Sequence, residues 1–441
     1  VVLYSILGFM LFENLVEIYL SSRQVKVYRT SQKVPKQLEN SISQETFEKA
    51  RVYGLDKENY SIFKTIIAGC IIVPLELYFG FIAYLWAQSE VLAGKVNLDA
   101  KNEIHVSCVF TLIMNLVSLV KDIPFKIYEL FILEEKHGFN KQTAAFFIKD
   151  QLKALAVSQI LTIPLTAAVV FIVQRGGEYF FLWLWAFTAL VVLFLITLYP
   201  VVIAPLFDKF YPLEEGELRE SIEKLAASLK FPLTKLYVVE GSKRSSHSNA
   251  YFYGFWKSKR IVLFDTLLLN KGKKDDSELN EDEKGKGCTN EEILAVLGHE
   301  LGHWKLGHML KNTIIIQVHL FLMFAAFSYL FKYDPFYRAI GFPHGEKPIL
   351  VGLFIILVHV LGAYNAVINF AMTILSRRFE YQADEFAKNL GYAKQLKLAL
   401  IKLNIDNLGF PIYDWMYSAW NHSHPTLLQR LGRLDDDKKD K

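Results

Sequence analysis

The sequence has little charge and little cysteine for its length. Asp, Glu, Lys and Arg supply only 21% of its 441 residues, whereas 52% are hydrophobic. Soluble proteins of this size carry more charge and disordered chains far more, so the disordered and fibrous classes are excluded. The three cysteines are widely spaced and predict neither a disulfide framework nor a cysteine metal cluster. The net charge of +4 is small, so we expect no nucleic-acid partner.

Long apolar stretches are what the sequence has in abundance. Aromatic residues make up 14% of the chain, which is typical of membrane proteins with aromatic belts. A helix that crosses a bilayer needs about 20 apolar residues. Seven stretches meet this need: 2–20, 62–86, 104–120, 154–174, 179–203, 312–331 and 349–375. The sequence therefore predicts a multi-pass membrane protein embedded in a lipid bilayer. Because the chain begins at Val1 without Met, we expect further N-terminal residues.

Basic residues alternate between the connections of these stretches. The basic connections are 22–61 and 121–153, and the base-poor ones are 87–103 and 175–178. Basic loops stay in the cytosol, which predicts a cytosolic 204–311 segment and a cytosolic C-terminus. The last residues, Lys438-Lys439-Asp440-Lys441, resemble a dilysine retrieval signal of the endoplasmic reticulum. Such a tail is equally an ordinary solubilising end.

The pattern divides the chain into four parts. These are 1–203 with transmembrane helices 1–5, 204–311 as a cytosolic α+β insertion, 312–375 with helices 6 and 7, and 376–441 as a C-terminal helical part with a cytosolic tail. Within the insertion, 214–230 has helical periodicity, and 236–241, 249–254 and 260–268 have the composition of strands. The charged, low-complexity run 271–287 predicts a disordered surface loop.

Polar residues occur inside the apolar stretches. Glu13 and Glu17 lie four residues apart and therefore on one helix face. They lie either near an interface or toward a watery cavity. The last two stretches contain His319, Gln317, His359, Asn365 and Asn369. Each of these could make a hydrogen bond between helices, or together they could line water.

One motif carries metal chemistry. Thr289 and Glu292 form a capping box that predicts a helix start. That helix contains His299-Glu300-Leu301-Gly302-His303, in which the two histidines share a helix face and can bind one Zn²⁺. Glu300 lies beside them as a candidate general base. Zn²⁺ suits this set because it polarises a carbonyl and lowers the pKa of water without redox chemistry.

A zinc site with two histidine ligands needs a third protein ligand. His308 is out of register with the metzincin pattern, which places its third histidine ten residues after the first. A better candidate is Glu380, with Asp384 four residues later on the same helix face. Glu380 could bind zinc while Asp384 orients a ligand histidine through its other ring nitrogen. The alternative is a solvated charged face.

With these motifs the sequence resembles a known family, the type I CAAX prenyl proteases. The resemblance covers nearly the whole chain, to about Arg433. The matching motifs are EEKHGFN (134–140), PLFDKF (205–210), VVEGSKRSSHSNAYFYG (238–254), VLGHELGHWKLGH (296–308), SRRFEYQAD (376–384), LNIDNLGFP (403–411) and SHPTLLQRL (423–431). Together these motifs are specific, whereas the H-E-x-x-H string alone is not.

The resemblance implies a mainly α membrane protein in which seven transmembrane helices surround a large chamber. A small cytosolic α+β zinc-metalloprotease part would hold one Zn²⁺ per chain. The implied reaction removes the last three residues of prenylated C-a-a-X proteins or peptides. Some members also make a second, upstream cut in a prenylated precursor, such as that of lamin A. The implied location is the endoplasmic reticulum membrane, with the contiguous inner nuclear membrane as an alternative.

The resemblance also implies residue roles. By motif, the zinc ligands are His299, His303 and Glu380, and the general base is Glu300. Asn249 matches a residue that holds substrate, and His424 matches a histidine that stabilises the transition state. An edge strand can pair with an extended peptide, and a histidine donor can stabilise an oxyanion. Without the family argument, Asn249 would be a turn residue and His424, beside Pro425, a capping residue.

Two other functions compete with this interpretation. An intramembrane protease of the site-2 type would place the zinc motif inside an apolar span, but here Trp304, Lys305 and Lys311 follow it and a polar loop precedes it. A zinc-binding transporter or chamber protein without proteolysis is the second. The presence of Glu300, which need not bind metal, argues against it.

Overall fold

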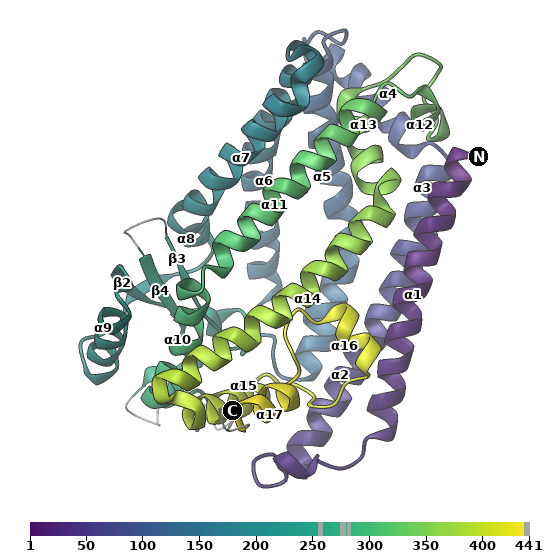
Figure 1. Ribbon diagram of the computed structural model, residues 1–441. Helices are drawn as coiled ribbons and strands as arrows, with labels where there is room; N and C mark the ends of the chain where they lie inside the picture. The colour runs from purple at the N-terminus through teal and green to yellow at the C-terminus, as the bar shows by residue number, and fades with distance from the viewer. Residues whose placement is uncertain (255–258, 274–278, 280–283, 436–441) are drawn as a thin grey trace, which may run out of the picture.

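The computed structural model describes residues 1–254, 259–273, 279 and 284–435. Long helices run along the molecule, and a small sheet lies at one end (Figure 1). Among the described residues, six helices are long and apolar enough to cross a membrane, and a bent helix pair, taken as one span, makes seven. The expected fold class, a mainly α membrane protein with a small α+β part, is confirmed.

The spans include most of the helical residues. Their elements are α1 (Val2–Thr30), α2 (Gln44–Lys64) with η2 (Thr65–Ile72) and α3 (Val73–Tyr78), α5 (Glu103–Tyr128) with η3 (Glu129–Glu134), α6 (Ala144–Arg175), η4 (Gly177–Tyr179) with α7 (Phe180–Leu198), η5 (Tyr199–Ile203) and α8 (Ala204–Phe207), and α11 (His308–Leu330). The bent seventh span consists of α13 (Ile349–Phe354), η10 (Ile355–Val360) and α14 (Gly362–Ala387), with a 62° bend.

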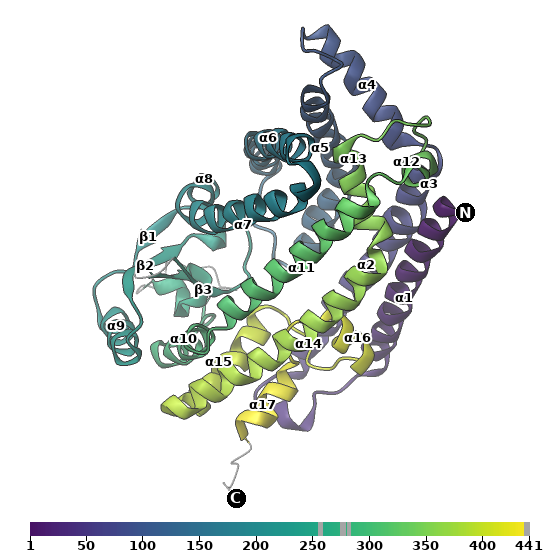
Figure 2. The same cartoon turned by 45° about the horizontal axis from the view of Figure 1, so that its top comes forward.

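The predicted bounds of the second span, 62–86, are wrong. The spanning helix runs from Gln44 to Tyr78 and ends before Gly80. Gly80 has a φ of 66°, a left-handed conformation that glycine adopts without steric cost. The chain continues as α4 (Phe81–Lys95), which reaches the end of the molecule remote from the sheet (Figure 2). The apolar composition continues across Gly80, so hydropathy alone did not reveal the break.

The spanning helices expose large apolar side chains. Ile160 on α6 is 71% exposed and Leu190 on α7 is 68% exposed. Contiguous apolar surface of this kind is rare on proteins that face water. All backbone groups of a helix are paired internally, so such a surface is compatible with the hydrocarbon core of a bilayer. The protein is therefore a multi-pass membrane protein.

Several polar residues of the spans contact other helices. The indole nitrogen of Trp420 donates to Glu17 at 2.6 Å, so this carboxylate faces protein rather than lipid. His319 forms a 3.1 Å hydrogen bond with the Tyr364 hydroxyl and stacks on its ring. The helices also enclose space, since an apolar cavity of about 530 Å³ lies among α5, α6, α7, α11 and α13.

The sheet has four strands in the order β1-β2-β4-β3. They are β1 (Phe210–Pro212), β2 (Leu233–Val239), β3 (Ala250–Tyr253) and β4 (Lys259–Phe264). β2 and β4 pair in parallel, and the two outer pairs are antiparallel. β3 is therefore an edge strand. β1 was not predicted, because it is short and ends in Pro212, which cannot donate a ladder hydrogen bond.

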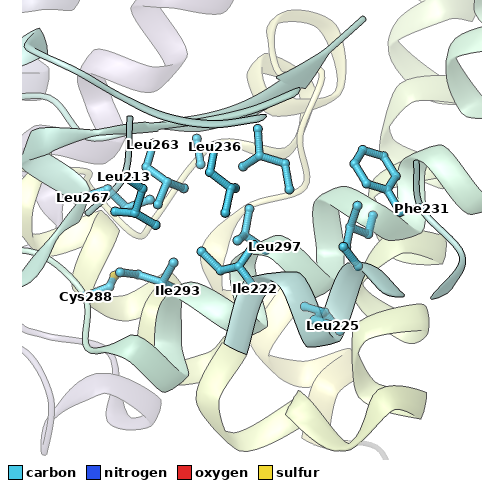
Figure 3. Packing of buried hydrophobic residues seen from close by; sticks show 14 of the residues in the cluster. Leu213, Ile222, Leu225, Phe231, Leu236, Leu263, Leu267, Cys288, Ile293 and Leu297 are labelled. Carbon is cyan, nitrogen blue, oxygen red and sulfur yellow. The ribbon is translucent and has the colours of Figure 1, made fainter. Parts of the chain in front are cut away.

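Two helices cover one face of this sheet. They are α9 (Glu217–Leu229) and α10 (Asn290–Lys305), and their buried side chains recur at helical spacing. Ile222 and Leu225 of α9 and Ile293 and Leu297 of α10 point toward the strands (Figure 3). Because Leu297 is 1% exposed and lies in the turn before the zinc motif, this core fixes where the motif lies.

Shorter elements complete the chain. They are η1 (Lys36–Leu38), η6 (Gly241–Lys243), η7 (Asp265–Leu267), η8 (Leu269–Gly272), α12 (Asp334–Ala339), η11 (Lys388–Tyr392), α15 (Ala393–Asp406), α16 (Trp415–Asn421) and α17 (Leu427–Asp435). α15 and α17 lie beside the end of α14 (Figures 1 and 2). The predicted boundary between 375 and 376 falls inside α14. Within the predicted 271–287 loop, residues 274–278 and 280–283 lie outside the described residues.

Arg244 connects the sheet part to a membrane helix. Its guanidinium binds the carboxylates of Asp150 on α6 and Asp208 and donates to the Phe207 carbonyl at 2.7 Å. Asp150 is buried, so its charge needs a partner. The arginine therefore fixes the loop before β3 relative to the spans.

Replacing Arg244 with Met should lower the free energy of unfolding by about 3 kcal/mol, because Asp150 would remain as a buried charge without its cation. Thermal unfolding in detergent measures the change as a lower Tm. The matched control is Lys243→Met, which removes an exposed ion pair with Glu240 and should change Tm little. Equal Tm values for the two variants would contradict the role given to Arg244.

Candidate metal centre

The zinc motif lies on a helix whose start is fixed locally. The Thr289 hydroxyl accepts from the Glu292 backbone N–H, and the Glu292 carboxylate accepts from the Thr289 N–H, so the predicted capping box is confirmed. From this start, helical periodicity places His299 and His303 one turn apart near the end of α10. Their Nε2 atoms lie 3.2 Å apart.

Glu380 joins the two histidines from another element. It lies on α14, and its carboxylate oxygens are 3.5 Å from His299 Nε2 and 3.3 Å from His303 Nε2. Ligand atoms 2.0–2.1 Å from a tetrahedral zinc lie about 3.3 Å from one another. The Glu380 Oε2 atom is also buried without a hydrogen-bond partner. The donor set therefore fits a zinc ion held by two nitrogens and a carboxylate.

A second layer of contacts orients His299. Its Nδ1 atom lies 2.9 Å from Asp384 Oδ1, one turn beyond Glu380 on α14. Arg430 of α17 binds the same carboxylate through two nitrogens, at 2.6 and 2.9 Å. The sequence pointed to Asp384 but not to Arg430. The arginine follows His424 in the SHPTLLQRL motif, yet no spacing rule connects it to α14.

His308 contacts the other histidine of the motif. Its Nδ1 lies 3.0 Å from His303 Nδ1, and its Nε2 lies 3.0 Å from the Gln382 side-chain oxygen. The ring also stacks on Phe379 at 4.1 Å. His308 therefore lies on the side of His303 remote from the three donor atoms. It supports the orientation of His303, a contact that the sequence did not reveal.

Glu300 directly follows His299 on α10 and carries a largely desolvated carboxylate. Its side chain has no hydrogen bond or ion pair within the part of the chain that the structure describes. Burial raises the pKa of Glu300, and the nearby His299 and His303 oppose this shift. A carboxylate with a raised pKa is a better proton acceptor than an exposed one, and it can return the proton later.

The last two predicted site residues come from the start of β3 and from the segment before α17. His424 Nε2 lies 3.3 Å from Glu380 Oε1, and its side chain is 63% exposed. Asn249 is exposed directly before β3, and its side-chain oxygen accepts from the Ala250 N–H at 2.8 Å. β3 packs beside α10. His424 therefore lies beside the metal-binding group, and Asn249 lies at the start of a strand that contacts the motif helix.

Such a site on such a scaffold defines a membrane-embedded metallopeptidase. Comparison with known proteins supports this class. The family model described as "CAAX prenyl protease N-terminal, five membrane helices" matches residues 24–209, and the model described as "Peptidase family M48" matches residues 212–438. The chain is 50% identical to the CAAX prenyl protease 1 homolog of Homo sapiens, over 95% of this chain and 92% of that protein. It is 44% identical to the homolog of Arabidopsis thaliana, over 99% and 98%.

The solved structures agree. The crystal structure of S. mikatae Ste24p superposes with a TM-score of 0.88 at 36% identity, over 98% of both chains. The chain therefore belongs to the CAAX prenyl protease family of M48 metallopeptidases. The resemblance predicted from the motifs is confirmed, and with it a membrane zinc peptidase. The alternative of a zinc-binding transporter without proteolysis is not favoured.

Metal content distinguishes the two candidate third ligands. Glu380→Ala removes a donor atom and should abolish stoichiometric zinc binding. His308→Ala removes only a contact to the far side of His303, so the variant should still bind one zinc, with affinity lower by about tenfold. Elemental analysis after dialysis against a zinc buffer measures both. Zinc loss in His308→Ala with retention in Glu380→Ala would overturn the ligand set.

Proposed function

We propose that this protein removes the three C-terminal residues of prenylated C-a-a-X proteins. Its relatives are named for this substrate class. One observation of the structure supports the same substrate. α14 runs without a break from a membrane span to Glu380, which lies beside the histidines of α10. The scissile bond of a prenylated chain directly follows its lipid-bearing cysteine, so the reacting centre must lie close to the bilayer.

The residues of the site divide the chemistry among them. His299, His303 and Glu380 would hold Zn²⁺, which when bound would polarise a carbonyl and lower the pKa of water. Glu300 takes a proton from the attacking water and delivers it to the departing amine. Asp384 accepts from His299 Nδ1 and so fixes which ring nitrogen faces the metal.

Two further residues act on the substrate. β3 offers its free edge to an extended peptide, and the Asn249 side chain fixes the peptide backbone at the start of that edge. His424 donates a hydrogen bond to the oxygen that becomes negative as the scissile carbonyl is attacked. Its Nε2 lies 3.3 Å from Glu380 Oε1, which places this ring nitrogen beside the metal-binding group.

The proposed location is the endoplasmic reticulum membrane, with the metal centre and the C-terminus in the cytosol. The alternation of basic connections supports this orientation. Because the inner nuclear membrane is contiguous with the endoplasmic reticulum, the same orientation would apply there.

Replacing Glu300 with Gln should lower kcat on a prenylated C-a-a-X peptide by about 10³- to 10⁴-fold, since the proton acceptor is lost. Zinc stoichiometry and Tm should barely change, because the three metal-binding side chains remain. The control is Glu291→Gln, an exposed carboxylate in the first turn of the same helix, which should cleave normally. A near-normal rate for Glu300→Gln would refute the mechanism.

Glycosylation reports the orientation. Asp99→Thr creates an N-x-T acceptor at Asn97, in an exposed turn after α4 on the side proposed to be luminal. This variant should gain one glycan in microsomes, and a second change of Asn97→Gln should remove it. The native acceptors Asn59-Tyr60-Ser61 and Asn421-His422-Ser423 should carry none, because both would be cytosolic. A glycan at Asn421 and none at Asn97 would reverse the proposed orientation.

A further inference from the structure

Two polar cavities share part of their lining. Each has a volume of about 460 Å³, within the range of small-molecule sites. The first lies among α2, α5, η3 and α6 and contains Glu129, Gln151 and Arg244. The second, called here the tyrosine cavity, is lined by Tyr28, Tyr53, Glu58, Phe410, Tyr413, Tyr417 and His422. Lys57 and His247 line both cavities.

The tyrosine cavity is close to the reacting groups on two sides. His247 precedes Asn249 by two residues, and His422 precedes His424 by two residues. Two residues of chain span at most about 7 Å. An extended peptide of three residues is about 10 Å long. The part of a substrate that follows the scissile bond can therefore reach this cavity.

Lys57 brings a positive charge to the cavity. Its ammonium group lies 3.3 Å from the Tyr53 hydroxyl, and no described carboxylate lies within 4.0 Å of it. The two nearby carboxylates have partners other than Lys57: Glu58 accepts from the Tyr417 hydroxyl at 2.8 Å. Glu134 accepts from the Tyr53 hydroxyl at 2.7 Å, and its other oxygen lies 3.6 Å from His247 Nε2. The ammonium group can therefore bind an incoming anion without breaking an ion pair.

His247 is held so that its ring borders the same space. Its ring stacks on Phe139 at 4.2 Å, and Nδ1 lies 3.2 Å from the Asn407 side-chain oxygen. The same oxygen accepts from the Ser248 N–H at 3.0 Å. Phe139 and Asn407 belong to the EEKHGFN and LNIDNLGFP motifs, to which the reaction itself gives no role. Both motifs fix the residues directly before Asn249.

We propose that the tyrosine cavity holds the three residues released from the substrate, and that Lys57 binds their terminal carboxylate. This inference rests on the proposed function. The aromatic side chains would contact the apolar residues of the released peptide, and the His247 ring would border its carboxylate. Because the cavity lies at the Asn249 end of β3, the substrate would pair antiparallel to that strand. Its prenylated cysteine would then lie toward the Tyr253 end.

The same contact would select where the chain is cut. A carboxylate bound at Lys57 fixes the distance from the C-terminus to the metal centre. A peptide with more residues after the cysteine would place either the cysteine or the carboxylate out of position. Charge-assisted hydrogen bonds are about twice as strong as neutral ones. A hydrogen bond between Lys57 and the terminal carboxylate is therefore strong enough to fix the distance from the C-terminus to the metal centre.

A comparison of two prenylated peptides tests the proposal. They share one sequence and end either in a free carboxylate or in an amide. The wild type should cleave the amide with kcat/KM lower by about tenfold or more. Lys57→Gln should lower kcat/KM for the carboxylate peptide by a similar factor and should no longer distinguish the two peptides. Lys57→Arg, which keeps the charge, should still distinguish them.

The control is Lys64→Gln, about two turns further along α2, where the ammonium group lies over the Phe125 ring. It should behave as the wild type does. Equal cleavage of both peptides by the wild type would overturn the carboxylate contact, and this measurement does not depend on the folding of any variant. Discrimination that persists in Lys57→Gln would overturn the assignment to Lys57. If the zinc-loaded wild type cleaves neither peptide, the proposed function itself fails.

Discussion

The chain of contacts from Arg430 through Asp384 to His299 is the constraint on which the site depends. Asp384 is 2% exposed, and a buried carboxylate without partners would be strongly destabilising. Its two partners come from different elements, since Arg430 belongs to α17 and His299 to α10. The C-terminal helix, a membrane helix and the motif helix are therefore positioned by one charge. The metal-binding geometry follows from this connection and not from α10 alone.

The sheet supplies the second half of the arrangement. Its core of aliphatic side chains holds α10 against the strands, and Arg244 ties the loop before β3 to α6. Because both attachments lie within a few residues of Asn249 or the zinc motif, the edge strand β3 and the metal-binding residues are placed relative to the same membrane helices. The part of the chain that contains the sheet and α10 is thus not an independent module, since the carboxylate of its metal centre comes from α14.

The sequence predicted features whose cause is local. The capping box predicted where α10 begins. Helical periodicity predicted that His299 and His303 share one helix face, as do Glu380 and Asp384. The family resemblance added Asn249 and His424, whose types alone favoured a turn and a cap. Other features depend on contacts between distant segments. Arg430 and His308 have roles only because α17 and α11 pack where they do, and the helix end at Gly80 interrupts a run whose hydropathy does not change.

The unbroken length of α14 has a mechanical consequence. Glu380 lies 18 residues beyond Gly362 on a helix of 26 residues, which places it about 27 Å from the bend. A helix in a bilayer changes its tilt when the hydrocarbon thickness changes. With the bend as pivot, a tilt of about 2° would displace Glu380 by about 1 Å, a large fraction of a metal–ligand bond of about 2 Å. A change in the tilt of α14 would therefore displace a metal-binding carboxylate, and the hydrogen bonds between Arg430 and Asp384 would oppose this displacement.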